Sequence, residues 1–321
     1  MRSIVFSILL ALAYGCGDAT SALDTRSVTA DSGRPGTDAG PSGSDGGSDA
    51  GSSGRDGGSG TDAGMAMADA GSTGSVGCVS GRGIDEGENT FMLEGLERRY
   101  RVYLPATYRR DRPWPVILAL HPNGGNTGYW NNTSGDRNIR GEAGDSAILV
   151  IAEAIDGEWR DYGMPASTWP SRIETELAYF DTIVDRLKTE LCVNENQIFA
   201  MGFSGGGSFS GVLGCRREYI RAIAVGGSVI YFDEVDCVST PASWITIGSG
   251  ELEAGRVDFR DFFRSAAKCD ETSAATDPAP CVSYDGCNAA TPVHYCQHSG
   301  GHQWPAFGTT AAWQFFQTFI E

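Results

Sequence analysis

The feature of this sequence that most restricts its fold is a series of short, continuous apolar runs separated by longer amphipathic segments. At 116–120 every residue is apolar, with no alternation of apolar and polar positions. A strand of this kind must be covered on both faces, as in a parallel sheet between two layers of helices. Strands are expected at 99–104, 116–120, 147–152, 198–203, 222–225, 244–247 and 293–295.

The segments between these runs show helical periodicity. Apolar residues recur at three- and four-residue steps over 172–191, which predicts an amphipathic helix packed on the sheet. Two further helices are expected at 256–268 and 309–320, and we interpret their aromatic residues as core packing. Strands that alternate with helices indicate the α/β class, with a mostly parallel central sheet and helices on both faces.

The start of the chain has the form of an export signal. Met1 and Arg2 precede an apolar run at 4–13 that is too short to span a bilayer, so residues 1–15 are interpreted as a signal peptide. Small residues stand just before Cys16, as at a bacterial lipoprotein cleavage site, and we expect Cys16 to carry a lipid. The alternative is an ordinary signal peptide that leaves Cys16 unmodified.

Residues 16–77 are rich in Gly, Ser and Asp and contain almost no large apolar side chains to offset the entropy of ordering the chain. We expect a disordered tether, with the folded domain at 78–321. Repeated Asp-Ala-Gly units lack the regular period of a stacked β-helix. The protein is therefore expected at a bacterial outer membrane or cell surface, held through its lipid only, or else in the extracellular medium.

Charge and cysteine content narrow the function classes further. The formal net charge of −17 argues against nucleic-acid binding. The eight cysteines other than Cys16 all lie in 78–321, and an exported compartment would oxidise them to as many as four disulfides, with the pairing left open. Because no Cys-x-x-Cys pair occurs, a zinc site built on thiolates is poorly supported.

The strongest chemical signal is the string Gly-Phe-Ser-Gly-Gly-Gly at 202–207, which lies directly after a strand at 197–201 and precedes a helix expected to begin near Ser208. This is the setting of the nucleophile elbow of α/β hydrolases and predicts Ser204 as the nucleophile. Glycine neighbours permit the strained turn that such a serine requires. A phosphate-binding loop is the alternative, but the string lacks the P-loop lysine and the spacing of a dinucleotide fingerprint.

A serine hydroxyl needs a general base, and the chain has four histidines. His302 is the predicted base because flanking glycines and a proline place it on a loop between the last strand and the last helix. We interpret His294, His298 and His121 as structural. A metal site made from the three late histidines would need one continuous helix, which the proline and glycines of this segment prevent.

The carboxylate that orients the histidine should follow the strand at 244–247. Glu251 is the favoured residue, Glu253 is the alternative, and Asp258 is a third candidate on the following helix.

Two backbone N–H groups are expected to form the oxyanion hole. One belongs to Gly205, at the start of the helix after Ser204, and the other to the loop at 121–125. Pro122 has no N–H, so Asn123 is the expected second donor.

Five strings occur in order at 101–105, 121–125, 202–207, 284–287 and 300–305. Together they resemble the feruloyl esterase and polyhydroxybutyrate depolymerase family of secreted α/β hydrolases, from about residue 99 to the end. The resemblance implies the α/β-hydrolase fold and makes His302, within Gly-His-x-Trp-Pro, the catalytic histidine. The chain departs from the family in having Glu251 where an aspartate is usual, and Pro122 where a glycine is usual.

The resemblance implies hydrolysis of a carboxylic ester through an acyl-enzyme, with feruloyl or acetyl esters of plant polysaccharide as first choice and polyhydroxyalkanoate as alternative. A catalytically inactive surface-binding lipoprotein is a further alternative. Trp169 and Trp304, with Trp159, are candidates to line a substrate pocket, although tryptophans more often pack structurally. We expect a monomer. We expect no metal or organic cofactor, because triad chemistry is self-contained.

Overall fold

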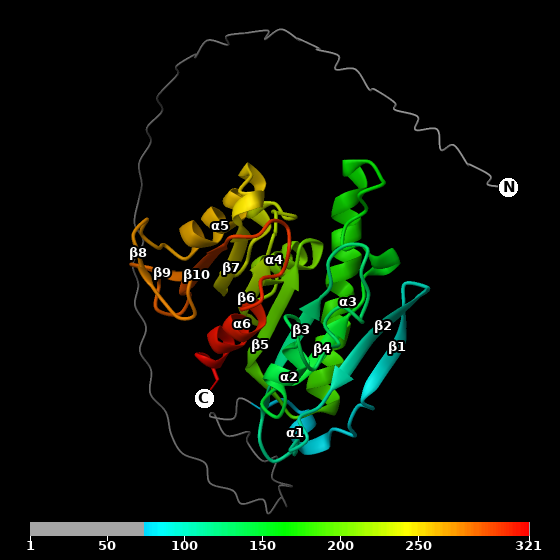
Figure 1. Ribbon diagram of the computed structural model, residues 1–321. Coiled ribbons are helices and arrows are strands. Elements are labelled where there is room, and N and C mark those ends of the chain that lie inside the picture. Colours follow the sequence, from blue (N-terminus) through cyan, green and yellow to red (C-terminus); the bar gives the residue numbers. More distant parts are fainter. Residues whose placement is uncertain (1–73, 321) are drawn as a thin grey trace, which may run out of the picture. The chain divides into compact units, whose positions relative to one another are not determined.

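A computed structural model describes residues 74–320, and a ten-stranded sheet runs through it in the order β1-β2-β4-β3-β5-β6-β7-β10-β9-β8 (Figure 1). The central strands, in the order β4-β3-β5-β6-β7-β10, pair in parallel. The pairs at the two edges, β1-β2-β4 on one side and β10-β9-β8 on the other, are antiparallel. The strands are β1 (Gly87–Leu93), β2 (Leu96–Tyr103), β3 (Trp114–Leu120), β4 (Ile148–Ala152), β5 (Val193–Phe203), β6 (Ile220–Gly226), β7 (Ala242–Gly248), β8 (Ser273–Ala275), β9 (Cys281–Tyr284) and β10 (Val293–His298).

Helices cover both faces of this sheet, as the sequence predicts for the α/β class. They are α1 (Gly77–Ser80), α2 (Ile139–Ala143), α3 (Trp169–Glu190), α4 (Gly205–Arg216), α5 (Ala254–Ala266) and α6 (Gly308–Gln317), with short 3₁₀ turns at Ile155–Gly157, Ala166–Thr168, Glu234–Asp236 and Ser249–Glu251. No helix among the described residues is both long and apolar enough to cross a bilayer.

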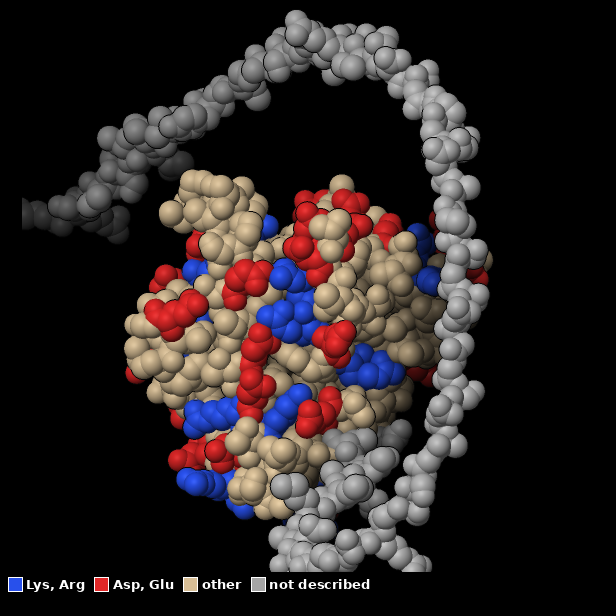
Figure 2. Space-filling model, turned by 180° about the vertical axis from the view of Figure 1, so that it is seen from behind, with Lys and Arg blue, Asp and Glu red and all other residues tan. Residues whose placement is uncertain are grey.

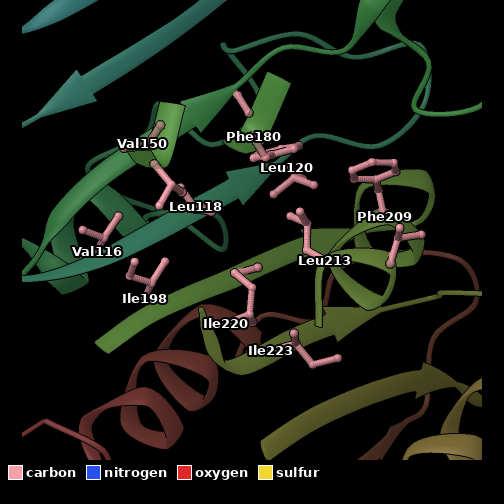
Figure 3. Close-up of a cluster of buried hydrophobic side chains, with 14 of the residues drawn as sticks. Val116, Leu118, Leu120, Val150, Phe180, Ile198, Phe209, Leu213, Ile220 and Ile223 are labelled. Carbon is pink, nitrogen blue, oxygen red and sulfur yellow. The ribbon is translucent and has the colours of Figure 1, made fainter. Parts of the chain in front are cut away.

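Two hydrophobic layers explain why the β3 sequence is continuously apolar. Leu118 and Leu120 point toward Phe180 of α3 and Phe209 of α4, and all four are fully buried (Figure 3). Ile117 belongs to the layer on the opposite face, which includes residues of α2 and α6. Side chains alternate between the two faces of a strand, so every position of β3 lies against a layer of buried residues.

Each strand expected from the apolar runs is present, with its ends shifted by a few residues. The strands that periodicity did not reveal are β1, β8 and β9, at the edges of the sheet. β8 is exposed along its whole length, and only one residue of β1 is buried, so neither has a core-facing apolar pattern. The helix after Ser204 begins at Gly205, a few residues before the expected start.

The folded part of the chain begins before the expected boundary at residue 78. Ser75 is buried, its N–H donates to Val193 O at 2.9 Å, and its Oγ donates to Leu191 O at 2.8 Å. Ser75 therefore packs with the domain that the structure describes. The expected signal peptide at 1–15, the lipid on Cys16 and the rest of the tether lie outside the described residues.

Four disulfides pair all eight cysteines of the domain, in agreement with the expected maximum. Cys78–Cys192 ties the start of the domain to the loop before β5 across 114 residues of sequence. The other three close shorter loops, and they are Cys215–Cys237, Cys269–Cys287 and Cys281–Cys296. Such a density of disulfides is typical of proteins that fold in an oxidising, exported compartment.

Charged groups are interspersed on the surface and paired within the core. On the face shown in Figure 2, Lys and Arg side chains mix with Asp and Glu side chains without a large patch of one sign. The buried pair is Arg98 of β2 with Glu176 of α3, whose atoms lie 2.6 Å apart and whose side chains are 2% and 0% exposed. Glu176 also accepts from Ile155 N–H at 3.1 Å, so this pair connects the sheet edge, α3 and the loop after β4.

Replacing Glu176 by glutamine should test this connection. Arg98 would remain buried without a counter-charge, so we expect the free energy of unfolding to fall by about 3–5 kcal/mol. Urea denaturation followed by circular dichroism measures the change. Arg109→Gln is the matched control, because Arg109 and Asp111 form an exposed pair expected to contribute less than about 1 kcal/mol. Equal losses of unfolding free energy in the two variants would contradict the stabilising role of the buried Arg98–Glu176 pair.

Candidate active site

Ser204 occupies the sharp turn between β5 and α4, with φ 54° and ψ −121°. Its backbone N–H donates to Gly226 O of β6 at 2.8 Å, which holds this uncommon conformation in place. Glycines make the turn possible, since a Cβ on Gly206 would overlap the carbonyl oxygen of Leu120 and one on Gly202 would overlap Gly206. The predicted strand–turn–helix setting is therefore present, with the hydroxyl standing clear of the sheet.

His302 lies on the loop between β10 and α6, where the sequence placed it. Its Nε2 is 2.8 Å from Ser204 Oγ, within hydrogen-bond distance. The ring packs against Phe203, with centroids 4.8 Å apart, and against Gly227, where a Cβ would come within 2.7 Å of the imidazole. These two neighbours leave the imidazole little freedom to turn away from the serine.

Glu251 completes the line of contacts. It ends the 3₁₀ turn directly after β7, and its Oε2 accepts a short hydrogen bond from His302 Nδ1. Its Oε1 accepts from Gly248 N–H at 3.0 Å, which orients the carboxylate. Glu253 points elsewhere with 66% exposure, and Asp258 is an exposed residue of α5. Of the three carboxylates considered from the sequence, the structure brings only Glu251 to the histidine.

Arg256, at the start of α5, was not foreseen from the sequence. Its Nε lies 2.9 Å from Glu251 Oε2, its Nη2 lies 3.2 Å from His302 Nδ1, and it also pairs with Glu253. Burial by itself would raise the pKa of Glu251, but hydrogen bonds from His302 and Gly248 and the charge of Arg256 outweigh it, so the pKa lies below its ordinary value. The carboxylate is therefore ionised at neutral pH.

The two residues expected to form the oxyanion hole are in contact through the Asn123 side chain. Gly205 is the first residue of α4, where the N–H has no partner within the helix. The Asn123 side chain packs directly on Gly205, since a Cβ there would overlap its amide group. Asn123 Oδ1 accepts from Trp159 N–H at 3.2 Å, and within residues 74–320 no hydrogen bond uses the backbone N–H of Asn123.

His121 is buried beneath this loop and has the structural role expected for it. Its Nε2 accepts from Ala154 N–H at 3.2 Å, and its carbonyl accepts from the indole of Trp159 at 2.7 Å. Burial lowers the pKa of His121, against a smaller opposing effect of the Pro122 carbonyl, so the ring is neutral and suited to accept this bond. The loop is thus tied to the segment directly after β4 and to Trp159.

The tryptophans considered for substrate binding are placed differently from one another. Trp304 is 6% exposed, and its indole donates to Thr309 Oγ1 at 3.0 Å within the core. It packs under the site, so its expected contact with substrate stays a prediction. Trp159 is fully buried. Trp169, at the start of α3, remains partly exposed and donates to Asp161 O at 2.6 Å.

Cavities and side-chain clusters elsewhere do not extend this site. A cavity of about 620 Å³ lies at the amino ends of β5 and β6, lined by Glu195, Tyr219 and Arg221 among others, and Ser204 follows the carboxyl end of β5. Within residues 74–320 no group of three or more His, Cys, Asp or Glu side chains is arranged to hold a metal ion.

Comparison with known proteins agrees with this geometry. No protein-family model matches the chain. Feruloyl esterase D of Neurospora crassa is 26% identical over 280 residues, 78% of this chain and 93% of that protein. Feruloyl esterase C of Emericella nidulans is 28% identical over 240 residues, 68% of this chain and 83% of that protein.

Solved structures show the same fold at lower identity. The Bacillus cereus carboxylesterase has a TM-score of 0.50 and 14% identity, covering 69% of this chain and 94% of its own. An S-formylglutathione hydrolase from Agrobacterium tumefaciens has a TM-score of 0.50 and 11% identity, covering 72% and 93%. The resemblance to feruloyl esterases that the sequence strings indicate is confirmed. The chain is a serine-type carboxylic-ester hydrolase of the α/β-hydrolase fold, related to the feruloyl esterases.

Proposed function

We propose that this protein is an exported esterase that cleaves feruloyl or acetyl esters of plant polysaccharide through an acyl-enzyme on Ser204. The observation that carries the proposal is the hydrogen-bonded line from Ser204 Oγ through His302 to Glu251. The relatives named feruloyl esterase support the choice of acyl group. Nothing in the described site favours a polyhydroxyalkanoate over these esters.

In the first half of the reaction, Ser204 Oγ attacks the ester carbonyl while His302 Nε2 takes the hydroxyl proton. Glu251 accepts the hydrogen bond from Nδ1 and stabilises the imidazolium that forms. The N–H groups of Gly205 and Asn123 stabilise the oxyanion. The tetrahedral intermediate then collapses, the alcohol leaves with the proton from His302, and the acyl group remains on Ser204.

In the second half, His302 Nε2 takes a proton from water, and the resulting hydroxide equivalent attacks the acyl carbonyl. The same two N–H groups hold the oxyanion. Collapse of this intermediate returns the proton to Ser204 Oγ and releases the carboxylic acid. Glutamate in place of the family's usual aspartate has a longer side chain, and the 3₁₀ turn ending at Glu251 gives it a place from which it contacts His302.

Export and anchoring complete the proposal. The four disulfides of the domain favour an oxidising compartment, where an esterase would meet polysaccharide. We propose that residues 1–15 direct export, that Cys16 carries the lipid, and that the segment up to about residue 73 lets the domain reach outward from the membrane.

The catalytic proposal predicts that wild-type protein hydrolyses p-nitrophenyl acetate and methyl ferulate, whereas Ser204→Ala loses at least roughly 10⁴-fold in kcat. Release of p-nitrophenol and of ferulic acid measures the two reactions. Equal rates for wild type and variant would support a non-catalytic binding protein instead. A panel that adds acetylated xylan and hydroxybutyrate oligomers assigns the substrate, and turnover of the oligomers alone would favour a polyhydroxyalkanoate depolymerase.

Glu251→Gln should lower kcat by roughly 10³–10⁴-fold, because the amide cannot stabilise the imidazolium or hold Nδ1 protonated. Glu253→Gln is the matched control. It removes the same charge, but from an exposed side chain two residues further along the chain. We expect its kcat to stay within a few-fold of wild type. A larger loss in Glu253→Gln than in Glu251→Gln, with both variants folded, would reverse the assignment of the acid.

Cys16→Ser should convert the full-length protein from a membrane-bound to a soluble exported form. Fractionation of cells expressing each protein, together with incorporation of labelled palmitate, gives the readout. Wild type should carry label and sediment with membranes, while the variant should do neither. A variant that still sediments with membranes would contradict anchoring through this cysteine.

A further inference from the structure

Arg160 is enclosed by aromatic rings near the candidate active site. Its guanidinium carbon lies 3.7 Å from the ring centre of Trp169, 4.1 Å from that of Tyr231 and 4.6 Å from that of Tyr162. The rings come from three separate segments, namely the loop after β4, the start of α3 and the loop after β6. We call this arrangement the Arg160 cage.

The positive charge in this cage has no acidic partner in the described part of the chain. Nearby Asp161 is ion-paired with Arg172 at 2.6 Å, and Glu158 accepts from the Tyr162 N–H at 3.3 Å. Within residues 74–320, Arg160 forms no ion pair within 4.0 Å, and its Nε is buried without a hydrogen-bond partner. Burial lowers the pKa of Arg160, against a smaller opposing effect of Tyr162. A partly buried cation without a counter-charge is costly unless a ligand supplies one.

The cage is connected to the candidate active site through the Asn123 side chain and through the loop after β6. The Tyr162 hydroxyl lies near the side chain of Asn123, and that side chain packs on Gly205. Tyr231 follows β6 on the same loop as Gly227, which contacts the His302 ring. The Tyr162 and Tyr231 hydroxyls also contact each other. The cage thus lies beside the oxyanion loop, and one of its rings belongs to the loop whose Gly227 contacts the predicted base.

The segment that carries Arg160 is held firmly before any ligand binds. Arg172 of α3 donates to Ile155 O at 2.5 Å and Glu158 O at 2.7 Å, as well as to Asp161. Trp169 donates to Asp161 O at 2.6 Å. A guanidinium whose surroundings are ordered in advance loses less entropy when it binds a ligand.

We propose that the Arg160 cage binds a carboxylate carried by the ester substrate, and so selects anionic esters over neutral ones. Guanidinium groups pair with carboxylates through two parallel hydrogen bonds. The aromatic rings of the cage cannot accept such a pair of hydrogen bonds. Tyr162 of the cage is 47% exposed and Met164, two residues further along the chain, is 55% exposed, so both can offer apolar contact to the rest of the substrate. The inference rests on the proposed esterase function and adds its substrate class.

Such a carboxylate has two possible sources. It can belong to the acid half of the ester, as in a monoester of a dicarboxylic acid, or to the alcohol half, as in an acetylated uronic acid. The kinetic test therefore compares p-nitrophenyl hemiglutarate with p-nitrophenyl valerate, and O-acetyl glucuronate with O-acetyl glucose. Wild type should prefer the anionic member of at least one pair by about tenfold in kcat/KM.

Arg160→Gln should remove that preference while changing kcat/KM for the neutral esters by less than about threefold, and Arg160→Lys should restore part of it. Arg112→Gln is the matched control, because Arg112 also stacks on a tryptophan, Trp114, at 3.8 Å but at the amino end of β3. It should leave both preferences unchanged. An equal loss of kcat/KM on anionic and neutral esters in Arg160→Gln would mean that the cage only supports the loop, and would overturn the proposal. A wild-type protein that shows no preference for anionic esters would also overturn it.

A binding measurement separates this proposal from the proposed catalysis. Calorimetric titration of the Ser204→Ala variant with p-nitrophenyl hemiglutarate and O-acetyl glucuronate should show binding that weakens about tenfold when Arg160→Gln is added. If wild type fails to hydrolyse any ester, the esterase function is overturned while this titration still decides on the cage. Unchanged affinity for both compounds in the double variant would overturn the cage as a carboxylate site.

Discussion

The contact on which the site depends is the close approach of helix α4 to the strands beneath it. A Cβ at Gly206 would overlap backbone oxygens of Leu120 and His121, at the end of β3. Because the helix begins directly above the strand ends, Ser204 is held at positive φ and Gly205 lies against the Asn123 side chain. A larger side chain at these glycines would lift the helix and separate the hydroxyl from the oxyanion loop.

The parallel order of the central strands then gathers the remaining groups. Asn123 follows β3, Ser204 follows β5, Glu251 follows β7 and His302 follows β10, so all four lie beyond carboxyl ends of strands. In a parallel sheet these ends share one edge. Ser204, Glu251 and His302, which are far apart in the chain, thus come within hydrogen-bond distance of one another in turn. The buried residues within each strand contribute only to packing.

Two arginines near this edge differ in how their charge is balanced. Arg256 contacts two glutamates, one of which also accepts the hydrogen bond of His302, so its charge stabilises an ionised carboxylate. Arg160 is surrounded by rings and has no such partner among the described residues. The first arrangement is complete in the protein alone, whereas the second has a charge that a substrate can neutralise.

The sequence by itself determined the class of fold and singled out the proposed nucleophile and base, because each depends on a local pattern. The continuous apolar run of β3 requires cover on both faces, and the glycines around Ser204 and the loop residues around His302 act through neighbours in sequence. Only the tertiary structure brought Glu251 rather than Glu253 to His302, paired the eight cysteines, buried Trp304 and brought Arg160 near the oxyanion loop. Those outcomes depend on distances between separate segments, and packing sets these distances to within an ångström while sequence spacing does not.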